Sequence, residues 1–202
     1  MVAAKTAADN GAKVVIVEKC EEGKAGGNTK VCGQLFAYAN GDKDAAKSYY
    51  TALAGGRDIE PEIIDAISEG VANMADILAD EFGFNKDEYM DWTGVNVGGT
   101  NMGAMSPEYP EMPGHEKMAL WTTHAGASDG YLYQGLKQNV TDRVDAIDVW
   151  YSSPAKSLIQ DPVTKTVVGV TVERDGKEMN IRALNGVCIC TGGFECNKEM
   201  VQ

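Results

Sequence analysis

Apolar residues recur at two spacings along the chain, and each spacing predicts a different element. Helical spacing runs through residues 3–10 and 44–53, and again from Pro61 until Gly83 stops it. Ser128 predicts the N-cap of a further helix that runs from Asp129 to about Asn139. We expect the apolar stripe of the longest helix to face a core, and it comprises Ile63, Ile64, Ile67, Val71, Met74, Ile77 and Leu78.

Short β-branched or alternating segments predict the strands. Residues 14–19 indicate a buried parallel strand, residues 146–151 alternate in polarity, and residues 186–190 form an apolar strand near the other end. Asp175-Gly176 is a strong hairpin turn between two further strand-like segments, so a small antiparallel meander is predicted over about residues 157–183.

The order of these elements predicts an α/β protein with a Rossmann-like parallel sheet to which the antiparallel meander is attached. About residues 85–126 are rich in Gly, Pro, Met and aromatic residues and have no sustained period. We expect this stretch to be an irregular excursion over the domain surface.

Composition and charge narrow the class of protein. The 202 residues suit one domain with a substantial core, and no apolar run approaches the length of a membrane span. The 30 acidic residues outnumber 18 basic ones, which argues against nucleic acid as a partner because phosphate binding needs a basic face. We expect a cytoplasmic location, with an exported parent protein left open.

Glu18 is the first candidate site residue, with Lys19 beside it. A carboxylate at the carboxyl end of a parallel strand can accept hydrogen bonds from both ribose hydroxyls of an adenine dinucleotide. The alternative, a charge that merely ends the strand, carries equal weight for this segment by itself.

Two glycine-rich runs add to this site. Gly26 and Gly27 give backbone freedom, while Asn28 and Thr29 carry short side chains that can bind phosphate or ribityl oxygens. Thr191-Gly192-Gly193 follows an apolar strand, where open α/β sheets bind ligands. Both runs in one chain favour a dinucleotide site over two unrelated turns.

The chain resembles the FAD-dependent oxidoreductases that include soluble fumarate reductases, urocanate reductases and 3-ketosteroid Δ1-dehydrogenases. The matching stretches are AADNGAKVVIVEK, GGNTKVCGQ, SPEYPEMPG, SSPAKSLI and CTGGFECNKEM. The resemblance implies noncovalent FAD, with Glu18 on the adenosine ribose and the Ala155 backbone at adenine. It also implies that Thr191, Gly192 and Gly193 pass the phosphate and ribityl region, and that the path from pyrophosphate to isoalloxazine is lined by Asn28, Thr29, Gly33 and Gln34.

The same resemblance implies that residues 1–202 are a partial FAD-binding domain. In the family, a strand and a Gly-x-Gly-x-x-Gly loop precede the first helix, and Met1 stands just after the position of the last glycine. The family also continues into a capping domain that carries the substrate-binding histidines and the proton-donating arginine. We therefore expect a fragment that lacks both parts, and no catalytic residue is assigned within it.

The cysteines and histidines carry weaker signals. The five cysteines are expected to be reduced, with Cys188 and Cys190 as small core residues and Cys32 as a small residue filling space beside the flavin. His115 is expected in a loop. His124 has no acid or base partner in the sequence pattern, so a structural or solvent-facing role is expected, and no metal site is predicted.

These observations favour the FAD-binding portion of an oxidoreductase that reduces or forms a C=C bond in a small carboxylate or steroid-like substrate. We expect this small molecule to be the partner of the intact parent protein. A truncated, non-catalytic interaction module that pairs with a complementary chain, or a homo-oligomer, is the alternative. A NAD(P)-dependent enzyme is disfavoured because only Glu18 resembles a nicotinamide enzyme's site.

Overall fold

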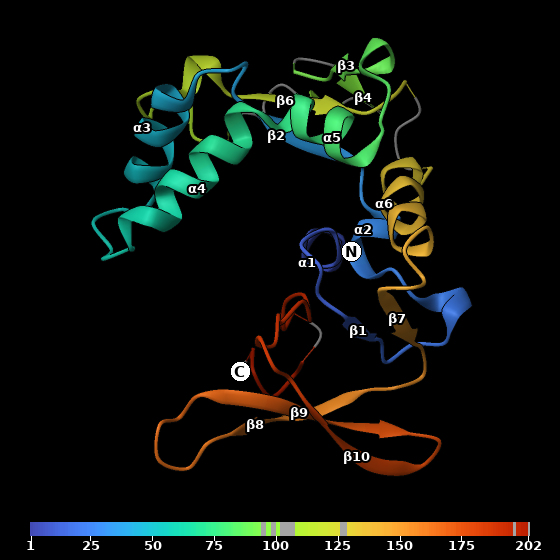
Figure 1. Cartoon of the computed structure of the whole chain (residues 1–202). Coiled ribbons are helices and arrows are strands. Elements are labelled where there is room, and N and C mark those ends of the chain that lie inside the picture. The colour runs from blue at the N-terminus through green and yellow to red at the C-terminus, as the bar shows by residue number, and fades with distance from the viewer. Residues whose placement is uncertain (94–95, 98–99, 102–107, 126–128, 196, 202) are drawn as a thin grey trace. The chain divides into compact units, whose positions relative to one another are not determined.

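The computed structural model describes residues 1–93, 96–97, 100–101, 108–125, 129–195 and 197–201 (Figure 1). The chain divides into two compact units. The first unit comprises residues 1–28 and 136–202, and the second comprises residues 29–135. The predicted helix cap Ser128 and the cysteine Cys196 lie outside the described residues.

A two-stranded parallel sheet organises the first unit. Helix α1 (Val2–Asp9) leads into β1 (Val14–Val17), and β1 runs beside β7 (Ile147–Trp150) in Figure 1. The predicted helix and the parallel pairing of these strands are confirmed. However, β1 is half-buried rather than buried, because Val15 points away from the core and is 41% exposed. The residues of the small core are Ala4, Val140 and Ile147, with Val14 and Ile16 against them.

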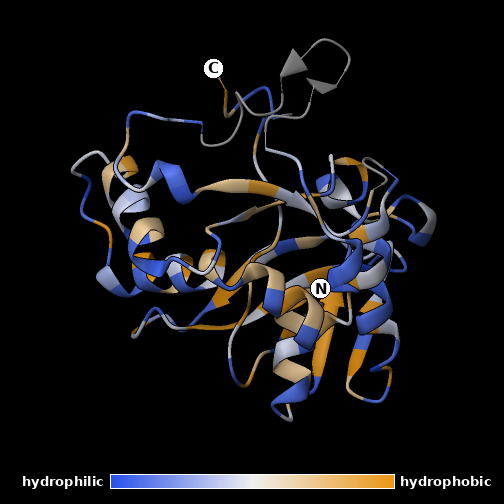
Figure 2. Cartoon of the chain, turned by 90° about the horizontal axis from the view of Figure 1, so that it is seen from above, coloured by the Kyte–Doolittle hydropathy of each residue, from blue (hydrophilic) through white to orange (hydrophobic). Residues whose placement is uncertain are grey.

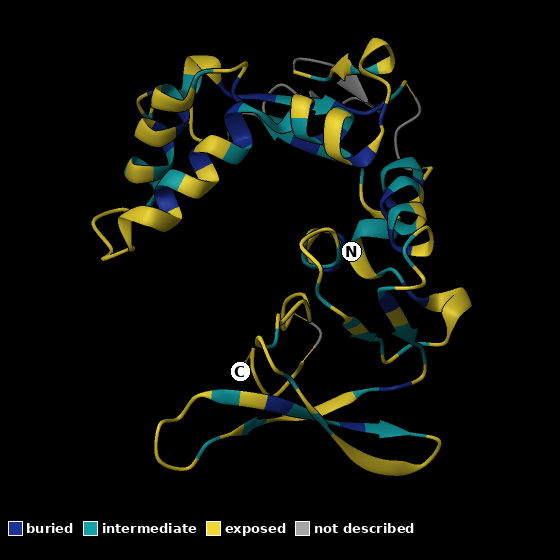
Figure 3. Ribbon diagram, viewed as in Figure 1, coloured by how far each residue is buried: buried dark blue, intermediate teal, exposed yellow. Residues whose placement is uncertain are grey.

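The antiparallel meander of the first unit is also confirmed. Strands β8 (Ala155–Gln160), β9 (Val167–Arg174) and β10 (Lys177–Arg182) form a sheet in the order β10-β9-β8. Asp175 and Gly176 both have positive φ, 52° and 71°, as a tight hairpin turn between right-twisted strands requires. The two outer strands are mostly exposed, whereas the central strand contains the buried residues (Figure 3).

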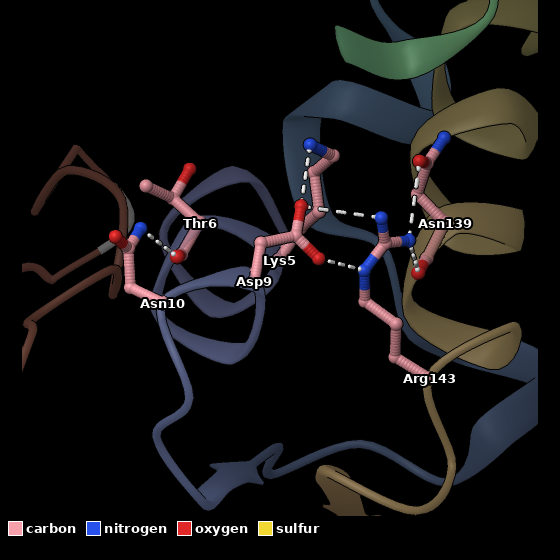
Figure 4. Close-up of polar contacts among 6 residues, drawn as sticks. All are labelled: Lys5, Thr6, Asp9, Asn10, Asn139 and Arg143. Atoms are coloured by element: carbon pink, nitrogen blue, oxygen red, sulfur yellow. Dashed lines mark hydrogen bonds and ion pairs between the residues drawn. The ribbon is translucent and has the colours of Figure 1, made fainter.

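A polar cluster fastens α1 within the first unit (Figure 4). The carboxylate of Asp9 accepts hydrogen bonds from Lys5 and from Arg143, and Arg143 also donates to the backbone oxygen of Asn139. Asn139 belongs to α6 (Tyr131–Thr141), a helix that crosses the boundary between the two units. Lys5 is buried at 6% exposure, so its charge is compensated by an ion pair, as burial requires.

The second unit combines a three-stranded antiparallel sheet with helices. The sheet has the order β2-β6-β3, and Phe36 of β2 lies directly opposite Trp121 of β6. Its helices carry hydrophilic and hydrophobic residues side by side, as Figure 2 shows, and pack their apolar sides inward. The strands are β2 (Leu35–Tyr38), β3 (Met90–Asp91) and β6 (Ala119–Thr122), and the helices are α3 (Lys43–Leu53), α4 (Pro61–Ala72) and α5 (Met74–Phe82).

The helix predicted from Pro61 to Gly83 is in fact two helices. Asn73 leaves helical geometry, with φ −107° and ψ 10°, and its side-chain amide donates to the backbone oxygen of Glu69. Such local side-chain bonds compete with the helical ladder, which explains the break. The predicted core stripe is only partly buried: Ile64, Val71 and Leu78 are buried, whereas Ile63 and Ile67 are 51% and 42% exposed.

The stretch predicted as an irregular excursion contains short elements. Strand β6 and strand β3 pair there, so part of it belongs to a sheet. Sequence periodicity missed them because β3 and β6 are two and four residues long. The remaining short elements are β4 (Asn96–Val97), β5 (Thr100–Asn101) and the 3₁₀ turns η2 (Lys86–Glu88) and η4 (His115–Lys117).

Candidate functional site

The backbone of Glu18 is fixed at the carboxyl end of β1. Its N–H donates to the backbone oxygen of Trp150 over 2.9 Å, and its own backbone oxygen accepts from the N–H of Ser153 over 2.8 Å. The parallel pairing of β1 and β7 thus extends one residue past the strand. This places the Glu18 side chain where open α/β sheets bind ligands.

The carboxylate of Glu18 is half-buried and oriented by its own loop. The oxygen Oε1 accepts a hydrogen bond from the backbone N–H of Cys20 over 2.8 Å. Within the described part of the chain, the second oxygen, Oε2, accepts no hydrogen bond. An oriented carboxylate with acceptor capacity left over fits a ribose diol.

A pocket of about 520 Å³ lies beside this strand end. Lys19, which follows Glu18, lines it together with Gly193 and Lys198, and two lysines on one pocket favour an anionic group. Asn197 and Lys198 belong to the matching stretch CTGGFECNKEM, but neither residue was predicted to have a role in the site. The pocket is completed by Phe194, Asn197 and Glu199.

Residues 191–193 are exposed, and Gly192 has a φ of 71°. No backbone hydrogen bond joins their N–H groups to another described residue, so these donors are available to a phosphate. The carboxylate of Glu195 lies beside Gly193 and opposes an anion there.

The strand predicted before this motif is not formed in the described part of the chain. A strand needs a hydrogen-bonded neighbour, and among the residues that the structure describes, β1 and β7 pair with each other and with no further strand.

The first glycine run turns the chain into a short helix. Gly26 and Gly27 have φ values of 126° and 51°, which other residues adopt only with strain. Gly27 begins α2 (Gly27–Val31), which follows the 3₁₀ turn η1 (Glu22–Lys24), and Asn28 is exposed. A side chain at Gly27 would meet no other atom nearby, so this glycine is required by its conformation rather than by crowding.

The remaining predicted residues of this run, Thr29, Gly33 and Gln34, belong to the second unit. Gln34 is 1% exposed, and its amide donates to the backbone oxygens of Thr29 and Cys32 over 2.9 and 3.0 Å. Its side-chain oxygen accepts from the N–H of Tyr133 over 3.3 Å. The hydrogen bonds of the Gln34 side chain therefore stabilise the loop that runs from Thr29 to Gln34.

Ala155 is exposed at the start of β8 and pairs with Val172. The preceding Pro154 accepts a hydrogen bond from the N–H of Glu173 over 3.0 Å, and Ser153 is fully buried. Since Ser153 also donates to Glu18, the same short segment connects the strand end at Glu18 with the backbone at Ala155. The structure thus brings two of the predicted adenosine contacts together.

His124 has an acid partner, which corrects the expectation from sequence. Its Nε2 lies 2.8 Å from a carboxylate oxygen of Asp129, and its ring contacts the ring of Tyr131 at 4.1 Å between centroids. The partner was missed because nothing in the residue pattern pairs His124 with an acid five residues further along the chain. His115, as expected, lies in a turn, where its Nδ1 contacts the backbone oxygen of Met112.

The cysteines also differ from expectation. Cys188 and Cys190 are exposed rather than part of a core, because their segment joins none of the sheets that the described residues form. Cys32 is exposed as well, so it fills no tight space. Among the described residues, no group of three or more histidine, cysteine or acidic side chains is arranged to hold a metal ion. None of the described helices is long and apolar enough to span a membrane.

The family assignment rests on the whole chain, because a model of the FAD binding domain matches residues 1–202. The chain belongs to the FAD-binding domain family. FAD is the cofactor of this family, and the strand end at Glu18 and the pocket that Lys19 and Lys198 line beside it fit this cofactor. The family match covers both compact units.

Curated relatives extend this result. The chain is 46% identical over 54 residues to a 3-oxosteroid 1-dehydrogenase of Comamonas testosteroni. This aligned region covers 27% of this chain and 9% of that protein. It is 27% identical over 211 residues to an NADH:fumarate oxidoreductase of Klebsiella pneumoniae (strain 342). This aligned region covers 100% of this chain and 20% of that protein.

Solved structures share the fold. A 3-ketosteroid Δ1-dehydrogenase from Sterolibacterium denitrificans matches with a TM-score of 0.77 at 19% identity, over 99% of this chain and 47% of that one. A 3-ketosteroid Δ4-(5α)-dehydrogenase from Rhodococcus jostii RHA1 matches with 0.70 at 21% identity, over 98% and 44%. The predicted Rossmann-like α/β fold is confirmed. This chain spans less than half the length of each of these relatives.

Proposed function

We propose that this chain is the FAD-binding portion of a flavin-dependent oxidoreductase that reduces or forms a C=C bond in a small carboxylate or steroid-like substrate. The observation that carries the proposal is the Glu18 carboxylate, oriented by Cys20 at the end of a parallel strand and next to a cationic pocket. The steroid dehydrogenases and the fumarate oxidoreductase among the relatives support the choice of substrate class.

Each contact with FAD is proposed for a particular residue. Glu18 accepts hydrogen bonds from the ribose hydroxyls, and the backbone at Ala155 meets adenine. Lys19 and the free N–H groups of residues 191–193 bind phosphate oxygens, since backbone donors and a nearby cation suit an anion. Gly26 and Gly27 permit close backbone approach, and the ribityl path is lined by Asn28, Thr29, Gly33 and Gln34.

When bound, FAD supplies hydride transfer to or from a carbon atom of the substrate. The contribution of this chain is to bind and orient the cofactor. Glu18 fixes the adenosine end, and the lysine-lined pocket neutralises charge on the phosphates. We assign no proton transfer to any described residue, and the chain by itself is expected to show no turnover with reduced viologen and fumarate, urocanate or an enone steroid.

Equilibrium titration tests the proposal. The purified chain is titrated with FAD, FMN and NAD, and protein fluorescence is followed. FAD and NAD both contain adenosine diphosphate, whereas FMN lacks it, so contacts at Glu18 and Ala155 predict weak but saturable binding of FAD in preference to FMN. NAD is expected to bind less tightly than FAD, because it offers no ribityl chain to Asn28 and Thr29. Equal affinity for FAD and FMN would contradict the assigned adenosine contacts.

One observation favours the alternative of a non-catalytic module that needs a complementary chain or forms a homo-oligomer. Several large apolar side chains near the end of the chain are exposed, Leu184 by 82%, Phe194 by 57% and Met200 by 62%. Exposed apolar surface of this kind is typical of an interaction site. Light scattering after size-exclusion chromatography separates the cases, because a monomeric mass at high protein concentration contradicts the homo-oligomer.

A further inference from the structure

Two thiols are in contact just before the Thr-Gly-Gly motif. The sulfur atoms of Cys188 and Cys190 lie 3.7 Å apart, and both residues are exposed. Residues two apart in an extended chain point to the same side, which is why the sulfurs meet. A disulfide bond is about 2.05 Å long, so the sulfurs need to approach by less than about 2 Å to form one.

The backbone around the two cysteines is free to adjust. A disulfide requires Cα atoms within about 7 Å, and two residues of fully extended chain span about that distance, so a slight contraction is needed. A strand held in a hydrogen-bonded sheet would resist it, but residues 187–190 join no sheet in the described part of the chain. Ile189 between the cysteines is 63% exposed and anchors no core.

We propose that Cys188 and Cys190 are a redox-active dithiol that closes reversibly to an internal disulfide by exchange with a small-molecule disulfide such as oxidised glutathione. The Cys188 thiolate attacks one sulfur of that disulfide, whose S–S bond breaks, and the first thiol leaves. Cys190 then loses its proton to solvent and attacks the sulfur of Cys188, which releases the second thiol. Two cysteine thiols are oxidised, and one disulfide is reduced to two thiols.

The contact between the sulfurs sets the order of these two steps. The hydrogen bond with Cys188 raises the pKa of the Cys190 thiol, and partial burial raises it further. Cys190 therefore forms its thiolate less readily than an ordinary cysteine. The attacking sulfur is that of Cys188, and Cys190 resolves the mixed disulfide.

Peptide mass spectrometry tests this dithiol. The chain carrying Cys196→Ala is equilibrated with mixtures of reduced and oxidised glutathione, alkylated and digested with trypsin, which releases residues 183–198 with only two cysteines. We expect the peptide to lose two hydrogens without an adduct. Because the second thiol is tethered beside the first, the internal disulfide should exceed the glutathione adduct by about tenfold or more.

Single variants provide the matched controls. Cys188→Ala and Cys190→Ala each leave one thiol, which should stop at the glutathione adduct, with faster adduct formation at Cys188 than at Cys190. Circular dichroism checks that the fold is unchanged. Two alkylated thiols across the whole range of glutathione ratios, or two adducts without an internal bond, would overturn the proposal.

Discussion

The guanidinium of Arg143 binds the carboxylate of Asp9 through two hydrogen bonds, Nε to Oδ1 over 2.5 Å and Nη2 to Oδ2 over 3.2 Å. Lys5 donates to the same carboxylate over 2.8 Å (Figure 4). The hydrogen bond from Arg143 is the largest cause that lowers the pKa of Asp9 to about 2, and the bond from Lys5 adds to it. One carboxylate thus joins α1 to the segment that follows α6.

This cluster predicts acid sensitivity. The pKa of Asp9 is lower in the folded state than in the unfolded chain, so its stabilising effect is present above the unfolded value near 4 and is lost as pH falls toward 2. Asp9→Asn should lower the thermal midpoint at pH 7 and flatten its fall between about pH 4 and 2. Thermal melts against pH measure this, with Asp58→Asn in an exposed loop as the control. Parallel curves for Asp9→Asn and the native chain would contradict it.

A second prediction concerns Glu18. Hydrogen bonds to charged groups contribute roughly 1.5–3 kcal/mol, so Glu18→Gln should weaken FAD binding by about tenfold to a hundredfold in a protein that binds FAD through this site. Glu18→Asp should fall between, because the shorter side chain reaches the ribose less well. The matched control is Glu21→Gln in the same loop, where the carboxylate pairs with Lys24 on the surface. Unchanged affinity for Glu18→Gln would leave Glu18 as a charge that ends a strand.

Two helical glycines should respond to alanine in opposite directions. A Cβ at Gly135 of α6 would lie 2.4 Å from the ring of Phe84, whereas one at Gly70 of α4 would meet nothing within 4 Å. Gly135→Ala should destabilise by about 1–3 kcal/mol through overpacking, and Gly70→Ala should stabilise by about 0.5–1 kcal/mol through helix propensity.

Urea denaturation measures both changes. Adding Phe84→Leu, which removes the ring, should restore part of the loss in Gly135→Ala and none of the effect at Gly70. A Gly135→Ala variant that is more stable than the native chain would contradict the prediction, because it would show that the Phe84 ring moves aside at little cost.

The mode of flavin attachment is the fourth prediction. The glycine pair is followed by Asn28 and Thr29 rather than by a histidine that could carry a covalent flavin. FAD in the protein that contains this chain is therefore expected to be noncovalent. Acid precipitation should leave a colourless pellet and a yellow supernatant, while a flavin-bearing peptide spanning residues 26–34 would refute the prediction.

Local patterns predicted what local interactions determine. Residues 14–17 and the Asp175-Gly176 turn form the elements that their sequence indicates, because a β-branched run and a turn with two positive φ values favour one conformation. The position of Glu18 at the end of a strand was predicted in the same way, because the β-branched run that forms the strand ends just before Glu18 in the sequence. The use of Glu18 as a ribose ligand stays a prediction.

Long-range pairing was beyond the sequence. Strands β2 and β6 are four residues each and are stabilised by each other, so neither shows a period long enough to notice. The contact between His124 and Asp129 joins residues that no sequence pattern pairs. The exposure of Cys188 depends on the absence of a neighbouring strand among the residues that the structure describes. In each case the outcome depends on contacts that the local residue pattern does not specify.

The second unit begins and ends at adjacent points. Gln34, near its start, binds the N–H of Tyr133 near its end, and the ammonium of Lys30 lies 6.0 Å from the ring of Tyr133. A segment whose two ends are joined in this way has the geometry of an insertion, which a host chain accommodates without stretching its own backbone. The contacts of Tyr133 with Lys30 and Gln34 therefore close the second unit near the two points where it joins the rest of the chain.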